Sequence, residues 1–222
     1  MTSASTGPVE ELRRSWTATT RDAGLDPAVS SSAFDDLLGR YRSPGRAYHG
    51  VAHLASVLRT LEELTDGTPS AEVRLAAWYH DAVQGRGAGE DEAASARLAQ
   101  EQLVAAGLDH GRARRVGQMV EATAGHLVDA GRDVAVDPDT AVLLDADLAI
   151  LGADHDEYDR YTASVRQEYP HLDDTTFARG RAGVVRRLLD RPSLYLTEEA
   201  RRRFDDRART NLRRELARLT TP

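Results

Sequence analysis

The sequence predicts an all-α fold, a helical bundle that forms a single domain. Hydrophobic residues recur at helical spacing along nearly the whole chain, and this periodicity is the main sequence signal for helices. No convincing pair of alternating strands is present, and no internal repeat indicates a solenoid. The 222 residues, 41% of them hydrophobic and 29% charged, have the length and balance of one globular domain.

Capping residues mark the ends of the expected helices. Ser70 is a suitable N-cap, Asp137 precedes a proline at a first helical position, and acidic residues follow Thr197. We expect a flexible tail over residues 1–8 and a single domain over residues 9–222. The expected helices cover residues 9–22, 28–41, 50–65, 71–84, 91–106, 110–127, 138–151, 155–169, 174–190 and 198–219.

The composition removes several classes of catalyst. The chain has no cysteine and no lysine, so all 29 basic side chains are arginine. Without cysteine it can form no disulfide, no thiolate metal site and no cysteine nucleophile. Without lysine it can form neither a P-loop nor a Schiff base. A bound metal would therefore need histidine and carboxylate ligands.

The charge balance argues against a general nucleic-acid binder, because the formal net charge is −7 and such proteins usually carry a basic excess. The end of the chain differs, with 13 arginines against 6 acidic residues from Arg179 onward. A nucleic-acid-binding arm is one interpretation of this segment. A solvated helix with acid-before-base pairs four residues apart is the favoured one. These pairs are Glu198–Arg202, Glu199–Arg203 and Asp205–Arg209.

No membrane partner is expected either. The N-terminus lacks the basic and apolar regions of a signal peptide. No apolar run approaches the ~18 residues that a spanning helix needs. We therefore expect a cytoplasmic protein, and the sequence leaves its oligomeric state open.

Histidines and carboxylates fall at informative helical positions. The segment YHGVAH places His49 and His53 on one face if it is helical. His80, which Asp81 follows, falls on the apolar stripe of its expected helix. Asp147 falls on the apolar face of a later helix. Such a carboxylate is costly to bury unless something neutralises it.

A shared divalent cation would account for these placements together, because imidazole and carboxylate are suitable ligands for it. The candidate ligands are His53, His80, Asp81 and Asp147. Each also has an ordinary interpretation. A single histidine is commonly a hydrogen-bonded core residue, and Asp145 or Asp147 could pair with an arginine. The joint spacing, H-x3-H followed by an HD pair and a late aspartate, favours the metal.

This pattern resembles the HD superfamily of metal-dependent phosphohydrolases, named for the pair matched here by His80 and Asp81. More narrowly, the chain is similar to a bacterial family of predicted HD-superfamily metal-dependent hydrolases. The likeness covers about residues 40–219 and extends through Tyr158, Tyr161 and the segments RAYHGVAH, AAWYHDAV, EDEAASA, ATAGH, LLDADLAILG, FARGR and ARTNLRREL. The block YHGVAH also resembles the YHNxxH block of cyclic-nucleotide phosphodiesterases.

The resemblance implies an HD-type helical domain and assigns the metal ligands. They are His53, His80, Asp81 and Asp147. Asp147 is preferred over Asp145 because the last ligand of the superfamily usually follows a small residue. Asp145 would then support that ligand or substitute for it. The resemblance implies one or two divalent ions, with Mn, Fe, Mg, Ni, Co and Zn as the candidates.

The resemblance also implies roles for two further histidines. By likeness to the phosphodiesterase block, His49 is the general acid that protonates the leaving oxygen, although Gly50 stands where that block has asparagine. His126 corresponds to histidines that serve a second metal or the phosphate in some members of the superfamily.

The expected function is hydrolysis of a small phosphate ester, such as a nucleotide or a related metabolite, with a monoester and a diester both open. A bound cation lowers the pKa of water from ~15.7 towards ~7, and Asp81 would orient that water or bridge two ions. Arg46 and Arg181 are the candidates for binding phosphate, because the guanidinium fork matches it. A surface ion pair is the alternative role for either arginine.

Two other functions remain open at this point. One is an HD-type di-iron oxygenase in which His126 helps to hold a second iron. The other is a non-catalytic regulatory module that binds a metal or a nucleotide.

Overall fold

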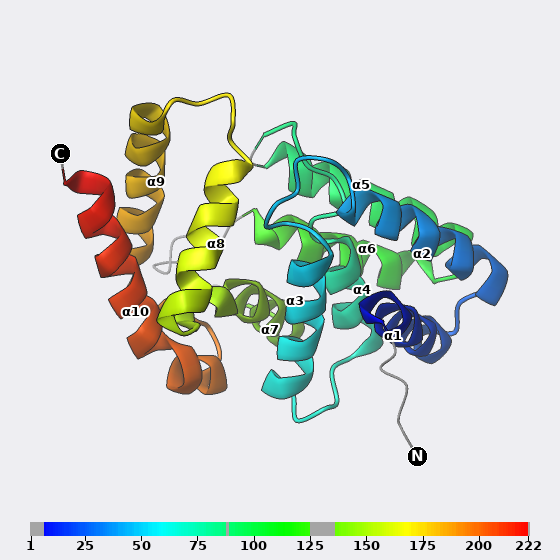
Figure 1. The fold of residues 1–222 in the computed structure, drawn as a ribbon. Coiled ribbons are helices and arrows are strands. Elements are labelled where there is room, and N and C mark those ends of the chain that lie inside the picture. The colour runs from blue at the N-terminus through cyan, green and yellow to red at the C-terminus, as the bar shows by residue number, and fades with distance from the viewer. Residues whose placement is uncertain (1–6, 88, 125–135, 222) are drawn as a thin grey trace, which may run out of the picture. The chain divides into compact units, whose positions relative to one another are not determined.

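The computed structural model describes residues 7–87, 89–124 and 136–221, which form helices and connecting turns with no strand among them (Figure 1). The all-α prediction is therefore confirmed. The elements are α1 (Pro8–Ala23), α2 (Pro27–Tyr41), α3 (Val51–Leu64), α4 (Ala71–Tyr79), α5 (Glu90–Ala105), α6 (His110–Thr123), α7 (Pro138–Leu148), the short 3-10 helix η1 (Ala149–Gly152), α8 (His155–Gln167), α9 (Asp174–Leu189) and α10 (Glu198–Thr220). None of these helices combines the length and the apolar character needed to cross a membrane.

The chain divides into two compact units. Unit 1 comprises Met1–Arg42 and Pro69–Ala124, and unit 2 comprises Ser43–Thr68 and Gly125–Pro222. Unit 1 therefore contains α1, α2, α4, α5 and α6, and unit 2 contains α3 and α7 to α10. The single domain expected over residues 9–222 stays a prediction.

The predicted caps are present. The Ser70 hydroxyl accepts a hydrogen bond from the backbone N–H of Val73 at 3.1 Å. The Asp137 carboxylate accepts one from the backbone N–H of Thr140 at 3.2 Å, and Thr197 caps α10 in the same way. Each cap satisfies an N–H group that has no partner inside its own helix.

Several predicted helices end earlier than expected, among them those over residues 71–84 and 138–151. The helix expected over residues 71–84 ends at Tyr79, because the polypeptide turns after His80 into a loop that is held by side chains rather than by helical bonds. The Asp91 carboxylate accepts hydrogen bonds from the backbone N–H groups of Gly85 (3.0 Å), Arg86 (2.8 Å) and Gly87 (3.4 Å). The helix expected over 138–151 tightens into η1 after Leu148.

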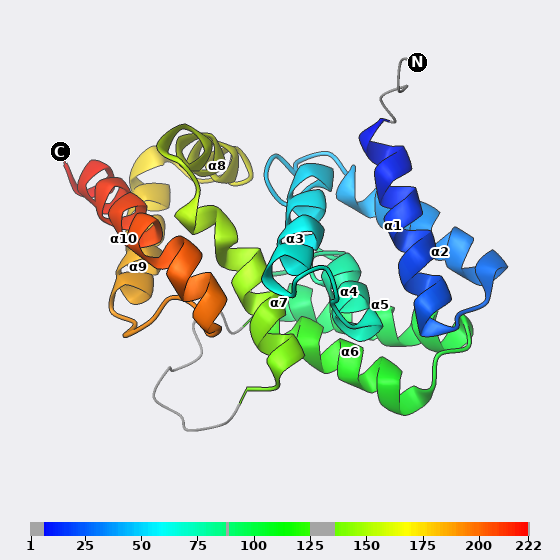
Figure 2. The same ribbon diagram turned by 90° about the horizontal axis from the view of Figure 1, so that it is seen from below.

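Aromatic side chains form the core of unit 1. Trp16 meets Trp78 edge-on with ring centroids 5.1 Å apart, and Phe34 lies 5.9 Å from Trp78. The Trp16 indole donates to the backbone carbonyl of Ser30 at 2.7 Å, which ties α1 to α2, and the two helices run next to each other in Figure 2. Edge-on packing of this kind adds to the stabilisation from buried area.

The core of unit 2 is built on α10. The buried residues there are Leu151, Tyr158, Val185, Leu188, Leu194, Tyr195, Ala200, Ala208 and Leu212. Helices α9 and α10 lie side by side in both views (Figures 1 and 2). The buried Asn211 amide donates to the backbone carbonyls of Leu151 (2.9 Å) and Ala153 (3.0 Å), so α10 also holds the segment that follows α7.

A buried polar cluster joins α8, α9 and α10. The Glu215 carboxylate accepts hydrogen bonds from the Tyr158 hydroxyl at 2.5 Å and from Nε of Arg181 at 2.7 Å. Arg181 also donates to the Tyr161 hydroxyl at 3.0 Å. Burial, reinforced by the charge of Glu215, raises the pKa of Tyr158 well above its usual range, so this hydroxyl stays a donor. We call these four residues the Glu215 cluster.

The arginine-rich end of the chain forms the expected salt-bridged helix. Arg203 pairs with Glu199 at 2.7 Å and Arg209 pairs with Asp205 at 2.8 Å. Arg202 also pairs with Glu199, at 2.6 Å, in place of the expected Glu198. Three residues separate Arg202 from Glu199, which also brings both side chains to one face of the helix.

The Glu215 cluster gives the first prediction. Glu215→Gln should destabilise the protein by about 3 kcal/mol, because it leaves the Arg181 charge buried without its partner. Chemical denaturation monitored by circular dichroism would measure the change. Glu198→Gln, at an exposed position on the same helix, is the control and should cost under about 1 kcal/mol. Equal losses in the two variants would contradict the assigned role of Glu215.

Candidate functional site

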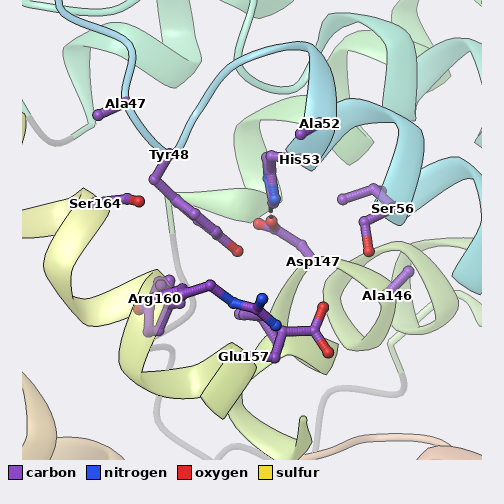
Figure 3. Close-up of a pocket in the computed structure, with 13 residues that line it drawn as sticks. Ala47, Tyr48, Ala52, His53, Ser56, Ala146, Asp147, Glu157, Arg160 and Ser164 are labelled. Atoms are coloured by element: carbon purple, nitrogen blue, oxygen red, sulfur yellow. Dashed lines mark ion pairs between the residues drawn. The ribbon is translucent and has the colours of Figure 1, made fainter. Parts of the chain in front are cut away.

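A pocket in unit 2 lies among α3, α7, α8 and the segment before α3 (Figure 3). Its cavity volume is about 230 Å³. The residues that line it are Ala47, Tyr48, Ala52, His53, Ser56, Val57, Ala146, Asp147, Ile150, Glu157, Arg160, Tyr161 and Ser164. Two of the four predicted metal ligands, His53 and Asp147, are among them.

His53 and Asp147 form an ion pair in this pocket. Nε2 of His53, on the first turn of α3, lies 3.0 Å from Oδ1 of Asp147, near the end of α7. Both side chains point into the pocket, and Figure 3 marks the pair. Only 3% of the His53 side chain and 14% of the Asp147 side chain are exposed. The two atoms that meet are atoms through which histidine and aspartate bind metals.

Asp145 has a different role from Asp147. Its carboxylate accepts hydrogen bonds from the backbone N–H groups of Leu196 and Thr197, both at 2.7 Å. Two residues along a helix correspond to about 200° of rotation, so the two carboxylates leave α7 in different directions. Burial raises the pKa of Asp145. Asp145 therefore fixes the segment that leads into α10, and Asp147 is the carboxylate that lines the pocket.

His49 is held by a residue that the sequence analysis did not identify. Its Nδ1 lies 2.6 Å from Oε2 of Glu168. Oε1 of Glu168 accepts the backbone N–H groups of Tyr48 (2.8 Å) and His49 (2.9 Å). Burial alone would raise the pKa of Glu168, but the hydrogen bonds from His49 and from these backbone groups outweigh it and lower that pKa. The carboxylate is thus a pure acceptor, and Nδ1 of His49 carries the hydrogen.

The imidazole of His49 lies next to the ion pair in the pocket. The ring centroids of His49 and His53 are 5.7 Å apart, and the Tyr48 ring lies 4.8 Å from each of them. Tyr48 also meets Tyr161 edge-on at 4.6 Å. Tyr48 therefore packs against both imidazoles and against Tyr161, which lines the pocket and also belongs to the Glu215 cluster.

In unit 1, His80 and Asp81 lie at the end of α4. His80 is 1% exposed, and its Nδ1 lies 2.8 Å from the backbone carbonyl oxygen of Ala77. A carbonyl only accepts, so Nδ1 carries a hydrogen, and in the neutral imidazole Nε2 then keeps its lone pair. This is the arrangement usual for a histidine that binds a metal. Nε2 lies 3.2 Å from Oδ2 of Asp81.

His53 and His80, which are buried, and Asp147, which is partly buried, make up a set of side chains that could hold a metal ion, each offering one ligand atom. Two imidazoles and one carboxylate suit first-row transition metals better than they suit calcium. Asp81, the fourth predicted ligand, is not one of these three.

The two predicted phosphate-binding arginines are engaged elsewhere. Arg46 donates from Nη1 to the backbone carbonyl of His49 at 3.0 Å, and Arg181 belongs to the Glu215 cluster. Neither lines the pocket, whereas Arg160 does. Arg160 lies two residues after Tyr158, inside a segment that the sequence analysis noted only for its tyrosines. His126 lies outside the described residues.

Comparison of the chain with protein-family models, with curated proteins and with solved structures finds no match in any of the three. The resemblance to the HD superfamily therefore stays a prediction that rests on motifs in the sequence. The structure adds an all-α fold and a set of histidines and an aspartate that could hold a metal ion.

Proposed function

We propose that this chain is a metal-dependent phosphohydrolase that acts on a small phosphate ester, such as a nucleotide or a related metabolite. The proposed ligands are His53, His80, Asp81 and Asp147. The observation that carries the proposal is the imidazole of His49, which Glu168 holds at 2.6 Å and whose ring centroid lies 5.7 Å from that of His53. A proton-transfer group beside ligand-type side chains is the equipment that ester hydrolysis requires.

The donor set supports a bound metal. His80 and His53 are buried, and each directs Nε2 toward a carboxylate oxygen at about 3 Å. A divalent cation bound there would supply Lewis acidity, polarising a phosphoryl oxygen and making water a better nucleophile at neutral pH. Without a cation, the same carboxylates can pair with protonated histidines. Metal binding should therefore be stronger at a pH where the histidines are neutral.

His49 and Glu168 would act together on the leaving group. Because Nδ1–H is committed to Glu168, Nε2 is the nitrogen that would hold the proton for the leaving oxygen. The carboxylate fixes the orientation of the imidazole. Tyr48 packs against the ring and limits its rotation. The proposed role of His49 is that of a general acid.

Metal binding is the first test of this proposal. Metal-stripped protein should regain phosphatase activity with one of Mn, Fe, Mg, Ni, Co or Zn. His53→Ala, His80→Ala and Asp147→Ala should each weaken binding of that ion by about 100-fold or more, since even supporting residues around a metal contribute 10- to 100-fold. Mass spectrometry of the metal content and calorimetry would measure this.

Asp145→Asn is the control for Asp147→Ala. It should lower the Tm, because one oxygen that accepts a backbone N–H is replaced, yet it should keep the metal content of the wild type. Full metal binding by Asp147→Ala, or no activity of the wild type with any metal, would overturn the proposal.

The pairing of His49 with Glu168 gives a second test. Glu168→Gln should lower kcat by about 100-fold at neutral pH, within the 10²–10⁴ range that acid–base groups contribute. His49→Ala should lower kcat by at least the same factor. The kcat of the double variant should be no lower than that of His49→Ala alone, because the two residues act as a unit. Steady-state kinetics would measure this. Additive losses would contradict joint action.

The lowered pKa of Glu168 also predicts a pH effect on stability. A carboxyl whose pKa is lower in the folded protein stabilises it above the unfolded value of about 4.3, and this contribution is lost as the pH falls through the folded pKa. The Tm difference between wild type and Glu168→Gln should therefore be constant at neutral pH and shrink below about pH 4. Exposed Asp156→Asn is the control. A difference that does not vary with pH would contradict the assignment.

A further inference from the structure

Two opposite charges on α8 face the pocket. Glu157 and Arg160 are three residues apart, which brings them to one side of the helix, and both line the cavity that contains His53 and Asp147. In Figure 3 both side chains lie on the pocket side of α8, opposite His53. The sequence analysis assigned neither residue to the site.

The side chains of Glu157 and Arg160 make no hydrogen bond or ion pair with any part of the chain that the structure describes. Two other charged side chains on α8 do form ion pairs. Arg166 pairs with Asp174 at 2.8 Å, and Asp159 pairs with Arg214 at 2.8 Å. The guanidinium of Arg160 can therefore bind a ligand in the pocket without giving up an existing contact.

The chemistry of the pocket selects the ligand. A guanidinium presents two parallel N–H groups to a phosphate. The walls include the small side chains of Ala52, Ser56 and Ala146. The volume of about 230 Å³ is below the ~300–1,000 Å³ of pockets that take drug-sized molecules. A second phosphate would lie near the Glu157 carboxylate, and like charges repel.

We propose that Arg160 binds the phosphate group of the substrate and that Glu157 excludes additional phosphates. The preferred substrate is then a phosphate monoester of a small neutral or cationic alcohol, and nucleoside diphosphates and triphosphates are poor substrates. This proposal rests on the proposed function, because it names the substrate class of the same pocket. It replaces Arg46 and Arg181 with Arg160 as the arginine that binds phosphate.

Binding of inorganic phosphate, measured by calorimetry on the full chain, tests the role of Arg160 without requiring turnover. Arg160→Gln should weaken phosphate binding by about 10- to 100-fold, the range for a hydrogen bond to a charged group. The phosphate affinity of Arg160→Lys should lie between those of the wild type and Arg160→Gln, because lysine keeps the positive charge and lacks the two parallel N–H groups of the guanidinium. Arg213→Gln is the matched control: it removes the same charge at an exposed position on α10 and should bind phosphate as the wild type does.

Binding of pyrophosphate tests Glu157. The wild type should bind inorganic phosphate more tightly than pyrophosphate, and Glu157→Gln should raise the relative affinity for pyrophosphate by about 5-fold or more. Glu157 also lies in the first turn of α8, where an acidic residue stabilises the helix. If Glu157 has only a structural role, Glu157→Gln should lower the Tm and leave the ratio of the two affinities unchanged. That result would overturn the proposed selectivity against additional phosphates.

The failures of the two proposals are distinguishable. If the wild type binds no phosphate, or if Arg160→Gln binds it unchanged, the role of Arg160 is wrong, whether or not metal-dependent hydrolysis is observed. If phosphate binding depends on Arg160 and no ester is hydrolysed with any metal, the anion site stands and the hydrolase proposal fails.

Discussion

The carboxylate of Glu215, inside unit 2, connects the three helices α8, α9 and α10. It accepts the Tyr158 hydroxyl from α8 and the Arg181 guanidinium from α9 while remaining part of α10. A buried ion pair of this kind adds little net stability compared with apolar packing, but it is costly to break. Its effect is to restrict how these helices can pack, because each hydrogen bond requires one particular register.

That restriction extends to the pocket through aromatic contacts. Arg181 holds the Tyr161 hydroxyl at 3.0 Å, Tyr161 meets Tyr48 at 4.6 Å, and Tyr48 meets the rings of His49 and His53. Buried aromatic rings have few alternative positions, since interiors are close-packed. The orientation of the proposed proton donor is thus determined by a charge cluster in the core as well as by Glu168.

Most of the fold could be predicted because helices are encoded locally. Apolar spacing and caps such as Ser70 and Asp137 lie within a few residues of the elements that they define. The early end of α4 could not be predicted in this way, since it depends on the Asp91 carboxylate capturing loop N–H groups that lie before it in the chain. Hydrophobic periodicity carries no information about such side-chain hydrogen bonds.

The residues of the candidate site also differ in whether a local sequence signal identifies them. Asp147 was identifiable because it interrupts an apolar helical face, and His53 because it lies four residues after His49. Both are local signals. Glu168 was not identifiable, because its partner His49 lies 119 residues away and because Glu168 is the C-cap residue that ends α8, where the helical periodicity stops. Arg181 was assigned to phosphate because its partner Glu215, 34 residues later, cannot be recognised from spacing alone.

The contacts of Glu168 also limit which substitutions are tolerated at this position. One oxygen of its carboxylate holds two backbone N–H groups at the entrance to α3, and the other oxygen holds the imidazole of His49. Aspartate is one methylene shorter and could not reach both at once, and glutamine offers only one acceptor oxygen. A substitution of Glu168 that alters the proposed proton donor therefore also disturbs the local backbone. Under the proposed function, selection for a folded loop and selection for chemistry would act on this single side chain, so neither property could be changed at this position while the other is kept.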